Sequence, residues 1–287
     1  MKFRGEGMKR TVGLIVDSTF GMDKAYAKAE NITIVPLKVL IGNDEYIDGT
    51  FDPQIAIDAM RDGVQIKTSQ PSPEVFMEAF KEQLELYDDV LCLTLSQSLS
   101  GTFNSASLAK TIFENPHVYV VDTETTISGG TYLAQKMVEF FDNNQNITQG
   151  LAYLEELKEK GSLIFTVDNL QTLVRNGRLG KVSAFIGNIL KVKPILRFRR
   201  GVLELEHKVR SQQNVLLYIV NEVKKMLEDN LVEVVIDFVD LSVSAKELEH
   251  AIYNLGDRVK VRLAGIVSPV ISAHIGLGGL GVYLTYQ

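Results

Sequence analysis

The sequence is poor in the residues on which disulfides and metal sites depend. Its 287 residues contain one cysteine, four histidines and no tryptophan. A single cysteine forms no internal disulfide, and Cys92 lies among leucines, so we interpret it as a buried thiol in the reducing cytoplasm. None of the histidines is followed by a second metal ligand three or four residues later, so neither a metal site nor a cofactor is expected.

Motifs of nucleotide and ester chemistry are also missing. The sequence has no GxxxxGK[ST] loop and no GxSxG turn. A glycine-rich run at residues 276–281 resembles the glycine motif of dinucleotide-binding proteins, but no strand-helix-strand unit follows it. The net charge of −6 argues against general binding to nucleic acid.

Residues 263–286 form the longest stretch without Asp, Glu, Lys or Arg. By length this stretch could span a bilayer, but five glycines, Pro269 and His274 argue against a membrane helix. We interpret it as buried backbone near a ligand or a domain interface. At the other end, the apolar run of residues 12–16 is too short for a signal peptide, and residues 1–7 are expected to be a frayed leader.

The first half of the chain alternates strands, polar loops and helices. Apolar runs at residues 12–16, 32–41, 90–95 and 117–121 predict strands, and Asp52-Pro53 and Ser72-Pro73 are typical helix starts. This alternation predicts an α/β domain with a mainly parallel sheet, in which ligands bind beyond the carboxyl ends of the strands.

The order of predicted strands and helices changes near residue 163. Short alternating strands follow, with a hairpin predicted at residues 197–206 that turns at Arg200-Gly201. We therefore expect two domains, an N-terminal α/β domain at residues 8–160 and a C-terminal α+β domain with mixed or antiparallel pairing at residues 161–287.

The loop at residues 96–102 is the clearest candidate site. It carries four hydroxyls and Gly101 between a predicted buried strand and a predicted helix. Hydroxyls and backbone N–H groups at a helix N-terminus suit an anionic ligand, although an ordinary Ser or Thr helix cap gives the same pattern.

One enzymatic hypothesis stays open on the residues alone. Ser100 could be a nucleophile and His274 its base, which would make the protein an acyl hydrolase. The orienting acid is not evident from the sequence, and Asp17 is the carboxylate that the fold could bring to His274.

Five separated segments, in order, resemble the DegV family of bacterial fatty-acid-binding proteins. They span nearly the whole chain and comprise Asp17-Ser18-Thr19, residues 67–72, residues 98–104, Asn176-Gly177-Arg178 and residues 269–281.

The resemblance implies a two-domain protein that buries one long-chain fatty acid, such as palmitate, in a tunnel and does not catalyse alone. It implies that Thr68, Ser100, Gly101, Thr102 and His274 bind the fatty acid carboxylate. In this site the hydroxyls of Thr68 and Ser100 donate to the carboxylate and His274 completes the network. It also implies that Arg210 docks a separate fatty acid kinase, similar to dihydroxyacetone kinases, which makes acyl phosphate for phospholipid synthesis.

Charge is consistent with such a partner. Residues 175–210 carry ten Lys or Arg against two Glu. Such a run is usually a solvated face, but it could also dock an acidic partner or a phosphate. A protein that senses fatty acids and signals to another protein is an alternative that the sequence does not separate from a carrier.

Overall fold

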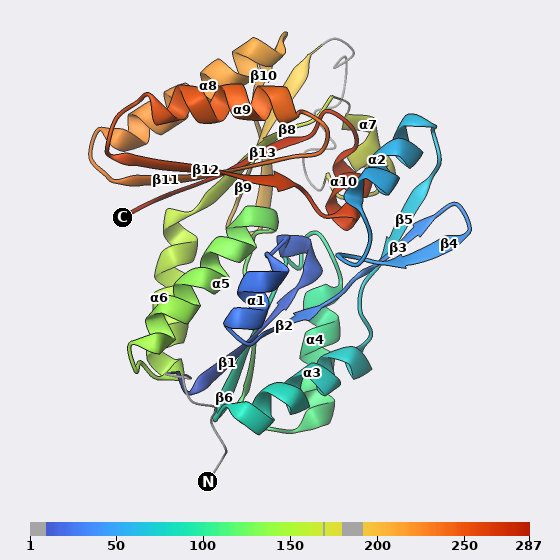
Figure 1. Ribbon diagram of the computed structural model, residues 1–287, viewed down its shortest axis with the longest axis vertical. Coiled ribbons are helices and arrows are strands. Elements are labelled where there is room, and N and C mark those ends of the chain that lie inside the picture. Colours follow the sequence, from blue (N-terminus) through green and yellow to red (C-terminus); the bar gives the residue numbers. More distant parts are fainter. Residues whose placement is uncertain (1–9, 169, 180–191) are drawn as a thin grey trace.

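The computed structural model describes residues 10–168, 170–179 and 192–287. Two large sheets, each with helices against it, lie one above the other in Figure 1, and a small third sheet extends to one side. The expected leader at residues 1–7 lies outside the described residues.

The N-terminal sheet is parallel throughout, as the alternating pattern predicts. Its order is β2-β1-β6-β7. Alternate residues of β1 point to opposite faces, so that Leu14 and Val16 pack toward α5 while Ile15 packs toward α3 and α4. The elements are β1 (Val12–Asp17), η1 (Ser18–Phe20), α1 (Lys24–Ala29), β2 (Ile32–Val35), α3 (Pro73–Leu86), β6 (Asp89–Thr94), α4 (Thr102–Phe113), β7 (Val118–Asp122), α5 (Ile127–Asp142) and α6 (Ile147–Lys160).

The small antiparallel sheet corrects the prediction of a single strand at residues 32–41. The structure divides this run into β2 and β3 (Lys38–Ile41), because Pro36 lies between them and offers no N–H for a continuous ladder. Strand β3 pairs with β4 (Asp44–Ile47) and β5 (Ile66–Ser69), and α2 (Pro53–Arg61) connects the last two. Asp52 caps α2 by accepting a hydrogen bond from the backbone N–H of Gln54, as its position before Pro53 predicts.

The C-terminal sheet is mixed, in the order β10-β9-β8-β13-β11-β12, and among the described pairings that between β11 and β12 is the parallel one. The predicted hairpin is confirmed, with Arg200 and Gly201 at its turn. The elements are β8 (Ser162–Thr166), α7 (Leu170–Arg175), β9 (Lys193–Arg199), β10 (Val202–Val209), α8 (Gln212–Leu227), β11 (Val232–Phe238), α9 (Ser242–Tyr253), β12 (Val259–Ile266), α10 (Pro269–Ile275) and β13 (Leu280–Tyr286).

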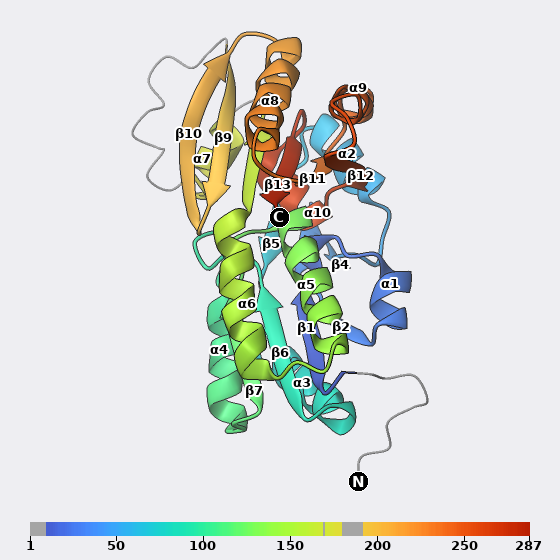
Figure 2. The same cartoon turned by 90° about the vertical axis from the view of Figure 1, so that its left-hand side faces the viewer.

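One face of the C-terminal sheet packs under α8 and α9, and the other packs on the N-terminal half. A single cluster of buried side chains joins Leu14, Leu93 and Leu133 to Leu163, Phe198 and Tyr283. Figure 2 shows the β9–β10 hairpin reaching toward α6. At its turn, the Gly201 N–H donates to the carbonyl of Glu124, in the loop between β7 and α5, at 3.0 Å. The boundary near Lys160 stays a prediction, although α6 ends at this residue.

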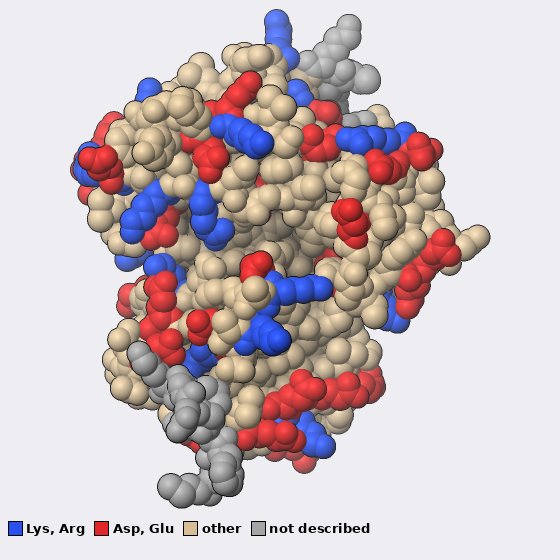
Figure 3. Space-filling model, in the orientation of Figure 1, with Lys and Arg blue, Asp and Glu red and all other residues tan. Residues whose placement is uncertain are grey.

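Most of the uncharged C-terminal stretch is buried, as predicted, but Ala264, Ile266 and Tyr286 are exposed. It contains α10, whose first five residues are buried, and β13, which is buried from Leu280 to Thr285. Within the described part of the chain, no helix is both long and apolar enough to cross a membrane. On the face seen in Figure 3, acidic and basic side chains are interspersed.

Candidate functional site

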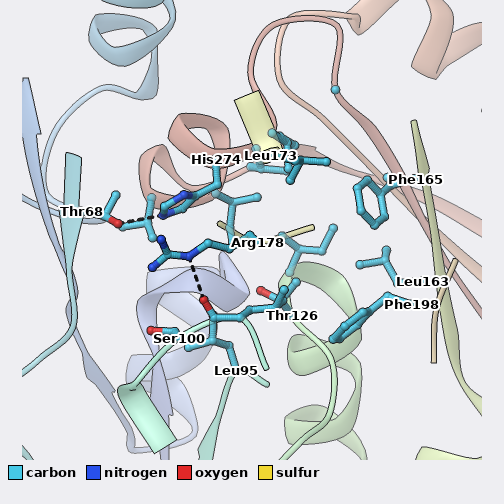
Figure 4. A pocket seen from close by; sticks show the side chains of 18 of the residues that line it. Thr68, Leu95, Ser100, Thr126, Leu163, Phe165, Leu173, Arg178, Phe198 and His274 are labelled. Carbon is cyan, nitrogen blue, oxygen red and sulfur yellow. Dashed lines mark hydrogen bonds between the residues drawn. The ribbon is translucent and has the colours of Figure 1, made fainter. Parts of the chain in front are cut away.

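An elongated cavity of about 290 Å³ lies where the two large sheets and the small sheet meet. Figure 4 shows Thr68, His274, Arg178 and Ser100 at one end, Leu163, Phe165 and Phe198 at the other, and Thr126 between them. The lining is Leu37, Thr68, Ser69, Gln70, Leu95, Leu99, Ser100, Thr126, Ile127, Leu163, Phe165, Leu173, Arg178, Phe198, Leu203, Phe238, Val267, Val270, Ile271, His274, Ile275, Gly279 and Gly281.

Thr68 and His274 meet at the polar end, although they are 206 residues apart in the sequence. Thr68 lies on β5, and its hydroxyl Oγ1 is 2.8 Å from Nε2 of His274 on α10. Helix α10 begins at Pro269, and Ser268 caps it by accepting from the backbone N–H of Ile271. The small sheet and α10 therefore fix this pair between them.

His274 is neutral at physiological pH. Burial and the nearby positive charge of Arg178 lower the pKa of its imidazole from 6.5 to about 4. Its second ring nitrogen, Nδ1, is buried without a hydrogen-bond partner among the described residues. The polar end therefore contains an imidazole with unused hydrogen-bonding capacity.

Ser100 lines the cavity from the loop between β6 and α4. Its Oγ lies 2.9 Å from Oγ1 of Thr102 and accepts from the Thr102 backbone N–H at 3.3 Å. Thr102 is fully buried as the first residue of α4, and neither it nor Gly101 lines the cavity. A Cβ on Gly101 would lie 2.0 Å from Oε1 of Gln70, so an alanine here would require the exposed Gln70 amide to move aside.

Arg178 is a charged lining residue that was not predicted as part of the site. Its guanidinium lies between His274 and Ser100 in Figure 4, and its Nε donates to the Leu99 carbonyl at 3.2 Å. Asn176, in the same turn, donates from Nδ2 to the Ala273 carbonyl at 3.1 Å. The Asn176-Gly177-Arg178 segment is one of the five that resemble the DegV family. Its sequence alone does not predict the direction of the arginine side chain.

Asp17 does not complete a hydrolytic triad. Its carboxylate accepts hydrogen bonds from the Thr19 N–H at 2.9 Å and the Leu95 N–H at 2.5 Å, and burial raises its pKa to about 6. Ser100 bonds to Thr102, and His274 bonds to Thr68. The geometry thus gives no support to the acyl hydrolase alternative, in which Asp17 would orient His274.

Part of the basic charge at residues 175–210 is already paired. Lys181 and Lys191 lie outside the described residues, and three of the other eight basic residues form ion pairs. Arg197 bonds to Glu206 and Glu222. Other ion pairs join Lys193 to Asp168, and Arg200 to Glu124, Glu155 and Glu159. Arg210 is exposed at the end of β10, just before the Ser211 cap of α8. Among the described residues, no group of three or more His, Cys, Asp and Glu could hold a metal ion.

The fold and the cavity define an α/β protein with two large sheets, a small third sheet and a mainly apolar cavity that has one polar end. A family model for uncharacterised proteins of the DegV family matches residues 11–287, and the chain belongs to that family. A DegV domain-containing protein of Deinococcus radiodurans is 32% identical over 283 residues, covering 96% of this chain and 98% of the relative.

Solved structures agree with the sequence relatives. A DegV family protein from Thermus thermophilus, described for its fatty acid binding, is 29% identical with a TM-score of 0.89 and covers 97% of this chain and 100% of its own. DegV of Bacillus subtilis, described as a fatty acid binding protein, is 26% identical with a TM-score of 0.88 at the same coverage. These likenesses confirm the two-part α/β fold and the family predicted from the sequence.

Proposed function

We propose that the cavity holds one long-chain fatty acid, with its carboxylate at Thr68, Ser100, Arg178 and His274 and its hydrocarbon toward Phe165 and Phe198. The observation that carries the proposal is the division of one cavity into a polar end and an apolar remainder. The descriptions of the Thermus and Bacillus relatives as fatty acid binding support it.

The polar end has donors suited to a carboxylate. If the neutral His274 carries its proton on Nε2, it donates to Oγ1 of Thr68, and the Thr68 hydroxyl proton is free to point at the ligand. Arg178 adds a positive charge close by, and hydrogen bonds from charged donors to carboxylates are stronger than neutral ones. Gly101 and Thr102 would act indirectly, by shaping the loop that presents Ser100.

The hydrocarbon would supply most of the affinity. Burying about fourteen methylenes at ~0.8 kcal/mol each gives roughly 11 kcal/mol, from which association costs of ~4 kcal/mol or more are subtracted. The carboxylate donors then determine which end of the lipid lies near the loops, rather than whether the lipid binds.

Native mass spectrometry of the purified protein tests the binding step. We expect a mass increase that matches one C14 to C18 fatty acid retained from the expression host. Ser100→Ala should lower the affinity of delipidated protein for palmitate about fivefold, the effect of one hydrogen bond. Ser98→Ala is the matched control, because Ser98 is in the same loop and bonds to Ser96 instead of lining the cavity. A wild type that neither retains nor binds fatty acid would refute the proposal.

The second part of the proposal is that this cytoplasmic carrier presents the carboxylate to a separate fatty acid kinase. The exposed Arg210 would contact the kinase, which would form acyl phosphate for phospholipid synthesis. Arg210→Ala should reduce kinase turnover on the bound lipid at least tenfold and leave lipid affinity unchanged. Lys224→Ala, at an exposed position of α8, is the charge-matched control. Unchanged turnover with Arg210→Ala would remove the docking role.

A further inference from the structure

The cavity wall contains a backbone conformation that its residue type disfavours. Ile127, the first residue of α5, has φ of 44°, in the left-handed region that β-branched residues rarely adopt. Both Ile127 and its neighbour Thr126 line the cavity. Such a conformation persists only where the surrounding structure holds it.

A carboxylate from the opposite sheet holds the start of this helix. Thr126 occupies the N-cap position of α5 but forms no side-chain capping bond. The hydroxyl and backbone N–H of Ser128, the second residue of the helix, lie close enough to the Asp237 carboxylate of β11 to favour its charged form by hydrogen bonding. A negative charge is favoured at this end of a helix by the aligned peptide dipoles. Asp237 therefore acts where an N-cap side chain ordinarily would.

The sheet leaves room for this carboxylate. The residues opposite Asp237 on the two adjacent strands are both glycines, Gly265 on β12 and Gly281 on β13. Gly281 lines the cavity, and a Cβ added to it would lie 3.0 Å from Cδ1 of Ile127 and 3.9 Å from Cβ of Asp237. Asp237, Gly281 and Ile127 thus form one contiguous layer at the wall.

The charge of Asp237 is poorly compensated. The side chain is 6% exposed, and its Oδ2 has no hydrogen-bond partner among the described residues. Ser128 on α5 and Gly281 on β13 bring no charge, and the charged group that acts on Asp237 is Arg262 of β12, which is itself exposed. A carboxylate kept in such surroundings needs an explanation beyond stability.

We propose that Asp237 is a positioning residue: from the C-terminal sheet it holds the first turn of α5, and with it the wall formed by Thr126 and Ile127, in the shape that receives the hydrocarbon chain. This inference rests on the proposed fatty acid function. It differs from the carboxylate site because Asp237 does not line the cavity and acts through the first turn of α5, whose residues Thr126 and Ile127 do.

A pH dependence follows from the location of Asp237. Burial raises the pKa of its carboxyl group to about 7. The ionised carboxylate is favoured at the helix N-terminus by the peptide dipoles, so ionisation strengthens its hold on the first turn of α5. Lipid affinity should therefore rise about three- to fivefold as the pH rises from 6 to 8.5, the change given by a ligand-linked pKa decrease of half to one unit.

The experiment compares palmitate affinity between pH 6 and 8.5 in wild type, Asp237→Asn and Ser128→Ala. The asparagine of Asp237→Asn keeps the side-chain shape and one hydrogen-bond acceptor but cannot ionise. We therefore expect near wild-type affinity for palmitate at pH 6 and loss of the pH dependence. Ser128→Ala should bind about fivefold more weakly, because one hydrogen bond to the carboxylate is gone. Asp240→Asn is the control, since Asp240 follows the same strand but accepts from the Gly278 N–H instead.

Hydrogen exchange in a peptide covering residues 123–134 gives a second readout that does not depend on lipid. Both Asp237→Asn and Ser128→Ala should exchange faster than wild type at the start of α5, while Asp240→Asn should not. Unchanged exchange together with a wild-type pH profile in Asp237→Asn would overturn the proposal. If wild type bound no fatty acid but the two variants still exchanged faster than wild type, the proposed function would be refuted and the positioning role of Asp237 would stand.

Discussion

His274 connects the chemistry of the polar end to the stability of the whole protein. Its pKa is about 4 in the folded protein, below the ordinary value of 6.5, so the unfolded chain takes up a proton first as the pH falls. The contribution of the neutral imidazole is complete above pH 6.5 and is lost as the pH falls toward 4. Because His274 is partly exposed, we expect its loss to cost about 2 kcal/mol between pH 7.5 and 4.5.

Denaturant unfolding at these two pH values measures this loss. Between pH 7.5 and 4.5, the free energy of unfolding of His274→Gln should fall by about 2 kcal/mol less than that of wild type. His250→Gln, at an exposed position of α9, should match wild type. The comparison between variants is essential, because burial raises the pKa values of Asp17 and Asp237 and these groups favour the folded state as the pH falls. An identical pH slope for His274→Gln and wild type would contradict the burial argument.

Arg178 supplies the positive charge of the site. Its Nε is bonded to the Leu99 carbonyl, and its guanidinium faces the space between His274 and Ser100. Hydrogen bonds to charged groups contribute about 1.5–3 kcal/mol, so Arg178→Gln should weaken palmitate binding roughly ten- to hundredfold. Binding should also lose part of its sensitivity to salt.

Titration of delipidated protein with palmitate at two salt concentrations measures both effects. Arg175→Gln is the matched control, because Arg175 is exposed three residues earlier and does not line the cavity. If Arg178→Gln and Arg175→Gln bound palmitate equally well, Arg178 would have no place in the carboxylate site.

At the scale of elements, the close contact of α5 with η1 is specified by a glycine. A Cβ at Gly130 would lie 2.2 Å from the ring of Phe20, which is 2% exposed. Alanine is favoured over glycine in a helix by about 1 kcal/mol, but overpacking a core costs about 1–3 kcal/mol. We therefore expect Gly130→Ala to be destabilised by about 1 kcal/mol, despite its better helix propensity.

The free energy of unfolding of Gly130→Ala, from urea titration, tests which effect is larger. Ala152→Gly, at an exposed position of α6, calibrates the propensity difference alone and should lose about 1 kcal/mol. A Gly130→Ala protein more stable than wild type would mean that Phe20 can move aside.

Elements whose signal is local could be predicted from the sequence, and those fixed by distant contacts could not. The helix start at Asp52 and the hairpin at Arg200-Gly201 were correct because capping and turn residues act on their neighbours. The small sheet was missed, since β3 pairs with β5 across the intervening α2. The same limit applies to the site, where Thr68 and His274 were named from a family likeness and their 2.8 Å contact came from the fold.

For the whole molecule, the cavity couples its two halves. Leu95 and Thr126 line it from the N-terminal half, while Leu163 and Phe198 line it from the C-terminal sheet. A ligand that contacts both halves should stabilise them together. Palmitate at a hundred times its Kd adds about 2.7 kcal/mol, which for a chain of this size raises Tm by roughly 5 °C.

Calorimetry of delipidated protein, with and without palmitate, measures this shift. One cooperative transition that moves as a unit is expected, because Leu14 and Leu93 of the first sheet share a buried cluster with Phe198 and Tyr283 of the second. Palmitic acid methyl ester is the matched control ligand, since it keeps the hydrocarbon and lacks the charge that Arg178 would bind, and it should raise Tm less. If two transitions appeared and palmitate moved one of them, the lipid would contact one half alone, and the cavity between the sheets would not be its site.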